Sequence, residues 1–162
     1  MRSFKCVIVG DGGVGKTSLV NKFLDCDFSN CYIPTIGTNV HPITFNTTYG
    51  LIALNVWDTA GKPEFGGLRD AYYIQSDCAI IMYDTRSSAR NVVNWHKDLT
   101  RVCPDIPIVL VGNKKDLSIC QYENPLKLPL VKISVKQNRD VEIPFLNLIR
   151  RLMDKEDLLF VN

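Results

Sequence analysis

Eight consecutive residues near the N-terminus have the composition and spacing of a phosphate-binding loop. The segment Gly10-Asp11-Gly12-Gly13-Val14-Gly15-Lys16-Thr17 fits the pattern G-x-x-x-x-G-K-[S/T] at every fixed position. Glycines let the backbone turn its N–H groups toward phosphate oxygens, and the N-terminus of a following helix favours bound anions. Lys16 should reach the β and γ phosphates, and the Thr17 hydroxyl should bind Mg²⁺ as a hard oxygen ligand. We therefore expect Asp11 to Ser18 to hold a nucleotide; a simple glycine-rich turn is the alternative.

A second candidate for metal chemistry is Asp58, which follows the apolar segment Leu51 to Trp57. At the carboxyl end of a strand, an aspartate can hold Mg²⁺ through its water shell, as a Walker-B aspartate does. On its own, Asp58-Thr59-Ala60-Gly61 could also be an Asx turn that ends a strand. Together with the phosphate loop, it indicates a Mg²⁺ site that includes Thr17 and Asp58.

A third motif, Asn113-Lys114-Lys115-Asp116, has the form N-K-x-D and follows the apolar run Ile108 to Gly112. The Asp116 carboxylate can accept two hydrogen bonds, which matches the N1–H and N2–H donors of guanine and has no counterpart on adenine. The Lys114 stem could lie on the face of the base. The segment Ser134-Val135-Lys136 is expected to offer backbone N–H groups to the same base. A charged surface loop is the alternative interpretation of the motif.

The apolar pattern of the chain predicts the elements that must bring these residues together. Strands are expected at 4–9, 40–45, 51–57, 78–83, 108–111 and 131–133, and helices at 16–24, 89–103 and 143–153. The second and third strands should form a hairpin with a polar connection at 46–50, while 25–38 and 114–130 should be mostly loop. Strands and helices alternate after the hairpin. This order predicts an α/β fold of the P-loop NTPase type, with a mainly parallel sheet, one antiparallel edge strand and helices on both faces.

The composition limits the possible functions. A length of 162 residues corresponds to about one domain, so residues 1–162 should form a single nucleotide-binding domain. The net charge of +2 argues against nucleic acid or an anionic membrane as an electrostatic partner. The six cysteines lack metal-binding spacing, which favours a reducing compartment, and His41 and His96 are expected to be surface or satisfied side chains. No apolar run is long enough to span a bilayer, and no C-terminal cysteine is placed to carry a lipid, so no lipid anchor is expected.

With three motifs in this order, the chain resembles the small GTPases over essentially its whole length. The resemblance implies that Phe28 stacks on guanine and that Tyr32 is the mobile tyrosine of the first switch segment. It also implies that Thr35 binds Mg²⁺ and senses the γ phosphate, which the N–H of Gly61 contacts in the second switch segment. A switch of this kind is ordered by GTP and released after hydrolysis. GTP or GDP with Mg²⁺ is therefore the expected ligand.

Lys62 occupies the position at which this family has its catalytic glutamine. The glutamine amide both accepts a hydrogen bond from the attacking water and donates one, whereas a lysine ammonium can only donate. The resemblance makes Lys62, Gly61, Thr35 and Lys16 the candidate catalytic residues of a GTPase, and the lysine predicts slow hydrolysis. The alternative is a GTP-held binding module in which hydrolysis has been lost.

Longer stretches resemble the Ran family of nuclear-transport GTPases in particular. They are His41-Pro42-Ile43, Asn55 to Gly61, Phe65 to Ile74, Asn94 to Leu99, Ile106 to Leu110 and Pro144 to Leu146. This resemblance implies importin- or exportin-type transport receptors, an exchange factor, an activating protein and Ran-binding-domain proteins as partners of a monomer found in nucleus and cytoplasm. Asn30-Cys31 and Gln121 to Leu128 lack the basic residues of that family, which should weaken contacts to acidic receptor loops. Residues 1–162 also do not include the acidic tail of that family. A Rab- or Rho-like membrane-traffic switch is the runner-up.

Overall fold

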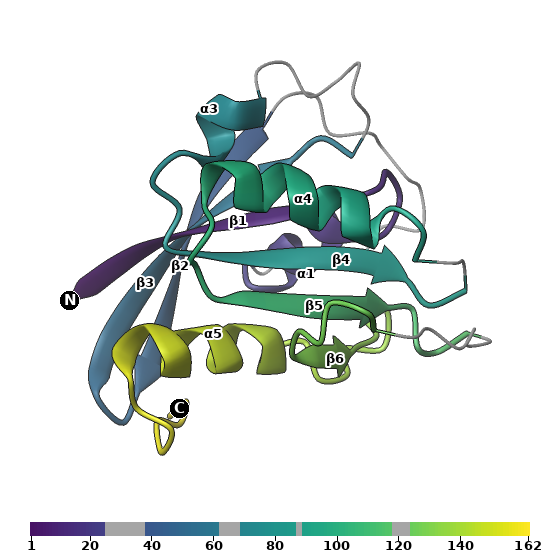
Figure 1. Ribbon diagram of the computed structural model, residues 1–162. Helices are drawn as coiled ribbons and strands as arrows, with labels where there is room; N and C mark the ends of the chain where they lie inside the picture. Colours follow the sequence, from purple (N-terminus) through teal and green to yellow (C-terminus); the bar gives the residue numbers. More distant parts are fainter. Residues whose placement is uncertain (25–37, 62–68, 87–88, 118–123) are drawn as a thin grey trace.

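A single six-stranded sheet organises the computed structural model, which describes residues 1–24, 38–61, 69–86, 89–117 and 124–162. The strand order is β2-β3-β1-β4-β5-β6 (Figure 1), and only the β2–β3 pair is antiparallel. The strands are β1 Arg2–Gly10, β2 Thr38–Thr47, β3 Gly50–Thr59, β4 Cys78–Asp84, β5 Ile108–Asn113 and β6 Leu130–Lys132. The helices are α1 Lys16–Lys22, α3 Arg69–Tyr73, α4 Val92–Val102 and α5 Ile143–Met153.

The sheet is covered on both faces, as expected from strands that are apolar at successive positions. On β1, Cys6 and Ile8 belong to the core cluster that also contains residues of α1 and α5, whereas Val7 and Val9 belong to the cluster with α3 and α4. Figure 1 shows α4 on one face of the sheet and α5 on the other. The predicted fold, a mainly parallel sheet with one antiparallel edge strand between layers of helices, is confirmed.

One local prediction was wrong, and one short helix was missed. The expected five-residue connection at 46–50 is shorter, because β2 continues to Thr47 and β3 begins at Gly50. Thr47 stabilises this tight turn: its hydroxyl donates to the Gly50 carbonyl at 2.7 Å and accepts the Tyr49 N–H at 3.1 Å. The short helix α3 was not predicted, since five residues give too little apolar periodicity to stand out.

The predicted helices and strands otherwise agree with the structure within a few residues at their ends. Helix α1 ends at Lys22 rather than residue 24, and α4 spans Val92–Val102 within the predicted 89–103. Three cysteines, Cys6, Cys78 and Cys103, are buried and unbridged. Within the described ranges, no helix is both long and apolar enough to cross a bilayer.

Candidate nucleotide and magnesium site

The phosphate loop connects the end of β1 to the start of α1, and its conformation depends on glycine. Gly15 has a φ of 103° and directly precedes α1, whose first turn closes with a 2.9 Å hydrogen bond from Leu19 N–H to the Gly15 carbonyl. A Cβ atom at Gly15 would overlap the side-chain amide of Asn113. Both the backbone conformation and the close approach of Asn113 therefore require glycine at this position.

Lys16 is folded back over the loop. It is only 6% exposed, and its Nζ donates to the carbonyls of Gly10 at 2.7 Å and Asp11 at 2.8 Å. Burial lowers the pKa of Lys16 to about 8, although the negative charges of Asp58 and Asp11 oppose this shift. A buried ammonium with a lowered pKa is stabilised by an incoming anion, which is what a nucleotide phosphate would provide.

Asp58 lies directly beside Thr17, as the sequence predicted. The Thr17 hydroxyl donates to Asp58 Oδ2 at 2.5 Å, and Asp58 is completely buried. Burial raises the pKa of Asp58, while the Thr17 hydrogen bond and the charge of Lys16 work in the opposite direction. Among the described residues, Asp58 Oδ1 is buried without a hydrogen-bond partner. A buried carboxylate oxygen without a partner next to a hydroxyl is a donor set that suits a hard cation such as Mg²⁺ with part of its water shell.

Asn113 joins the phosphate loop to the predicted base-binding loops. It ends β5 and is 3% exposed; its Nδ2 donates to the Val14 carbonyl at 2.9 Å, and its Oδ1 accepts the Val135 N–H at 3.1 Å. This one amide thus fixes the distance between the loop that would hold phosphate and the loop that would hold the base.

Lys114 makes a second connection to the phosphate loop. It adopts a left-handed conformation with φ 69°, and its Nζ donates to the Gly13 carbonyl at 2.7 Å while pairing with Asp84 Oδ2 at 3.0 Å. Burial would raise the pKa of Asp84, but hydrogen bonds from Arg86 and Lys114 outweigh it and hold the value at about 2. The Lys114 ammonium therefore bridges the end of β4 and the phosphate loop.

The predicted guanine-reading residue, Asp116, is held from the side by Ser134. The Ser134 hydroxyl donates to Asp116 Oδ1 at 2.7 Å and accepts the Gln137 N–H at 3.1 Å. The N–H groups of Ser134 and Val135 bond to the Arg139 carbonyl and the Asn113 side chain. Of the three N–H groups predicted to face the base, only that of Lys136 has no hydrogen-bond partner among the described residues.

Gly61 lies against the phosphate loop. A Cβ atom at Gly61 would overlap the backbone N and Cα of Gly12, so only glycine allows the two segments to touch. The segment just after β3 and the phosphate loop are therefore in direct contact. The contact of the Gly61 N–H with the γ phosphate, which the resemblance implies, stays a prediction.

The sequence model of the Ras family matches residues 5–154. The chain belongs to the Ras family. Proteins of this family generally bind GTP and GDP together with Mg²⁺, have GTPase activity, and interact with exchange factors and activating proteins. The matched range includes the phosphate loop, Asp58, Asn113 to Asp116 and Ser134 to Lys136, so the family and the geometry concern the same residues.

For a Ras-family site, the structure brings together most of the residues predicted from the sequence. The carboxyl ends of β1, β3, β5 and β6, with the segments that follow them, carry the predicted residues already described, and Ser18 lies in the first turn of α1. The predicted Phe28, Tyr32, Thr35 and Lys62 lie outside the described residues, so their assignment as base, metal and catalytic residues stays a prediction.

Sequence reasoning missed the contacts between α4 and the phosphate loop. Trp95, on α4, is 7% exposed. Its indole Nε1–H also donates to Asp11 Oδ1 at 2.9 Å, beside the Asn91 amide, which donates to the same carboxylate. The available signal was Asp11 itself, since a carboxylate within an anion-binding loop needs donors of its own.

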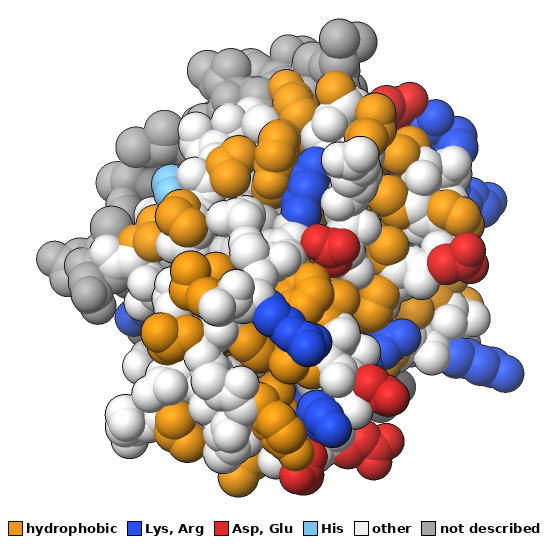
Figure 2. All heavy atoms as spheres, turned by 90° about the vertical axis from the view of Figure 1, so that its left-hand side faces the viewer, with side chains coloured by type: hydrophobic (Ala, Val, Ile, Leu, Met, Phe, Trp, Pro, Cys, Tyr) orange, Lys and Arg blue, Asp and Glu red, His pale blue; other side chains and the backbone are white. Residues whose placement is uncertain are grey.

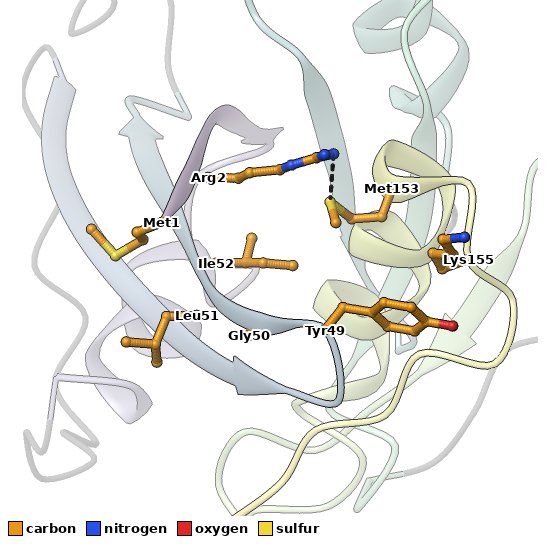
Figure 3. A pocket seen from close by; sticks show the side chains of 8 residues that line it. All are labelled: Met1, Arg2, Tyr49, Gly50, Leu51, Ile52, Met153 and Lys155. Atoms are coloured by element: carbon orange, nitrogen blue, oxygen red, sulfur yellow. Dashed lines mark hydrogen bonds between the residues drawn. The ribbon is translucent and has the colours of Figure 1, made fainter.

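A groove of about 540 Å³ lies at the other end of β1, away from the phosphate loop (Figure 3). Its lining includes Arg2 at the start of β1, Tyr49 in the β2–β3 turn and Met153 at the end of α5. Hydrophobic side chains are interspersed with Lys and Arg on this face (Figure 2). The groove shares no residue with the candidate nucleotide site.

Proposed function

We propose that this chain is a Ran-type molecular switch that binds GTP and GDP with Mg²⁺, hydrolyses GTP slowly, and acts in nucleocytoplasmic transport. The observation that carries the nucleotide assignment is the connection of the phosphate loop to the base-binding loops through Asn113 and Lys114. This connection gives one ligand a phosphate end at Lys16 and a base end at Asp116. Residues 1–162 would act as one guanine-nucleotide-binding domain.

The residues of the candidate site have separate tasks in this proposal. Lys16 neutralises the β and γ phosphates from a buried position, and the N–H groups of the phosphate loop surround their oxygens. Asp58 and Thr17 would hold Mg²⁺, which would offset the negative charge of the phosphates. Asp116 accepts hydrogen bonds from guanine while Ser134 fixes its carboxylate. The Gly61 N–H, close to Gly12, would contact the γ phosphate.

The decisive experiment for this proposal is to identify the bound nucleotide. The purified chain would be denatured, and the released small molecules separated by chromatography and identified by mass. We expect guanine nucleotide together with Mg²⁺. Release of adenine nucleotide, or binding of ATP and GTP with equal affinity after reloading, would refute the role of Asp116.

The transport role is supported by the sequence stretches shared with the Ran family, of which Asn94 to Leu99 and Phe65 to Ile74 are the longest outside the nucleotide motifs. We expect importin- or exportin-type receptors to bind the GTP-loaded chain more tightly than the GDP-loaded chain. We also expect the protein to be present in both nucleus and cytoplasm. A binding assay with a purified receptor and the two loaded forms tests this. Equal binding of both forms, or preferential binding to Rab or Rho effectors, would count against the Ran assignment.

A second function is favoured by Lys62, which replaces the glutamine that positions the attacking water. In this case the chain is a GTP-held binding module for transport receptors that depends on nucleotide exchange rather than hydrolysis. Single-turnover hydrolysis with and without an activating protein separates the two. If the activating protein accelerates measurable hydrolysis, the switch is supported. If no hydrolysis is detected, the binding module is supported.

A further inference from the structure

Asp11 places a carboxylate in the middle of a loop that is expected to bind phosphate. A negative charge facing phosphates would repel them, because like charges at close range interact strongly in a partly buried site. In the structure the Asp11 side chain is directed to the N-terminal end of α4 instead. Its carboxylate accepts hydrogen bonds from Trp95 Nε1 at 2.9 Å and from Asn91 Nδ2 at 3.1 and 3.2 Å. The partial positive charge at the start of this 11-residue helix further stabilises the carboxylate there.

The backbone of Asp11 belongs directly to the phosphate site. Its carbonyl accepts a 2.8 Å hydrogen bond from the Lys16 ammonium, and the carbonyl of Gly10 accepts another at 2.7 Å. A shift of the Asp11 backbone would therefore displace an acceptor of Lys16, and a rotation of its side chain would bring a carboxylate closer to the phosphates. The position of the Asp11 side chain and the geometry of Lys16 are coupled through a single residue.

Trp95 is the buried member of this contact. Its side chain is packed in the core between the sheet and α4, so its N–H has a fixed direction, whereas Asn91 is exposed. The guanidinium of Arg69, from α3, lies over the Trp95 ring with its Cζ 5.0 Å from the ring centre, and it also pairs with Asp98 at 3.5 Å. Trp95 thus contacts α3 with its ring and the phosphate loop with its N–H.

We propose that Trp95 is a positioning residue for nucleotide retention: its indole N–H holds the Asp11 carboxylate against α4 and away from the phosphates. This keeps Lys16 and the phosphate loop in their binding arrangement. The inference rests on the proposed nucleotide binding and adds to it a residue outside the loops that touch the nucleotide.

The first test is Trp95→Phe, which keeps an aromatic ring beneath Arg69 and removes the N–H donor. The dissociation of fluorescently labelled GDP from the full chain with Mg²⁺ is measured by displacement with excess unlabelled GDP. We expect dissociation about tenfold faster than in the parent, which corresponds to about 1.4 kcal/mol. Hydrogen bonds to charged groups have contributions of this size.

The matched control is Trp57→Phe, the same substitution at the other tryptophan. Trp57 lies on β3 with its ring near Lys5 and Tyr72, and its N–H has no hydrogen-bond partner among the described residues. The control should release GDP at the parent rate. Thermal unfolding of both nucleotide-free variants shows whether either substitution has changed the fold.

The second test distinguishes charge from packing. In the Trp95→Phe background, Asp11→Asn removes the negative charge that is no longer held against α4. We expect the double variant to release GDP more slowly than Trp95→Phe alone, because the repulsion of phosphate is gone, whereas a packing defect would not be repaired. A parent-like rate for Trp95→Phe, or a double variant as fast as the single one, would overturn the inference. A parent chain that binds no nucleotide would instead refute the proposed function, and this inference with it.

Discussion

Lys16 provides a quantitative prediction, because its charge should depend on pH within an accessible range. Burial lowers its pKa to about 8 in the nucleotide-free structure. Bound phosphates would restore the charged form and return the pKa toward its ordinary value, so binding should be accompanied by proton uptake above pH 8. At pH 9 about nine in ten Lys16 side chains are neutral before binding, which predicts an uptake of about 0.9 proton per nucleotide.

The sign of the effect is opposite for binding and for folding. Nucleotide affinity should fall by about tenfold between pH 7 and pH 9, because the binding-competent, protonated form of Lys16 decreases over this range. The nucleotide-free protein should become more stable by about 1.4 kcal/mol over the same range, since the unfolded chain retains the Lys16 proton that the folded chain releases. Two opposite trends from one group are a distinctive signature.

Titration calorimetry with GDP in two buffers of different ionisation enthalpy measures the proton uptake directly. The control variant is Lys16→Arg, whose guanidinium stays protonated throughout and which shares every titration of the nucleotide itself. Only the difference between parent and Lys16→Arg is attributed to Lys16. Lys132→Met, which replaces an exposed lysine on β6, should take up as many protons on binding GDP as the parent does. Proton uptake equal to that of Lys16→Arg at pH 9 would refute the assignment of a buried, low-pKa ammonium to this site.

Three further predictions concern other parts of the chain. Asp116→Asn should weaken GTP binding and increase affinity for xanthosine nucleotides, because its amide can donate to a carbonyl at C2; competition binding with an unchanged preference for GTP would contradict this. Lys62→Gln should hydrolyse preloaded GTP at least about tenfold faster than the parent in single-turnover assays, because the glutamine can both accept from and donate to the reacting groups. Equal rates would mean that another group positions the water. Phe145→Ala should lower the free energy of unfolding by about 3–5 kcal/mol in denaturant titrations, since this fully buried ring packs edge-on against Phe23 with centroids 4.9 Å apart. Leu159→Ala, at a 52% exposed side chain, is its control and should change stability by less than about 0.5 kcal/mol.

The parts of the site that depend on strand order were predictable from the sequence. Apolar runs that stop just before Gly10, Asp58 and Asn113 predicted three strands, and the alternation of strands with helices predicted a parallel arrangement with these ends at one edge. Residues that follow such strands must then be neighbours in space. Topology thus brings Thr17 and Asp58, 41 positions apart in the sequence, to the same edge of the sheet, where their side chains make a 2.5 Å hydrogen bond.

The parts that depend on side-chain direction were not predictable. Nothing in the spacing of the phosphate motif indicates that the Asp11 carboxylate points to a tryptophan 84 positions away, or that the N–H of Val135 is used by Asn113 rather than left for the base. Such contacts are decided by packing between elements, for which a single sequence contains no periodic signal. Helix α3 was missed for a related reason, because a five-residue helix is maintained by its tertiary contacts rather than by its own propensity.

Lys16 and Asp58 show what kind of ligand the site is built to accept. Lys16 and Asp58 are both buried, and burial makes the charged form of each less favourable: it lowers the pKa of the lysine and raises that of the aspartate. Their mutual attraction opposes both shifts without cancelling either. An anion alone would stabilise Lys16 but act against Asp58, and a cation alone would do the reverse. A magnesium–phosphate complex would supply both charges at once, a cation for Asp58 and an anion for Lys16. We therefore expect nucleotide and Mg²⁺ to bind with positive cooperativity, each increasing the affinity of the other by the same factor.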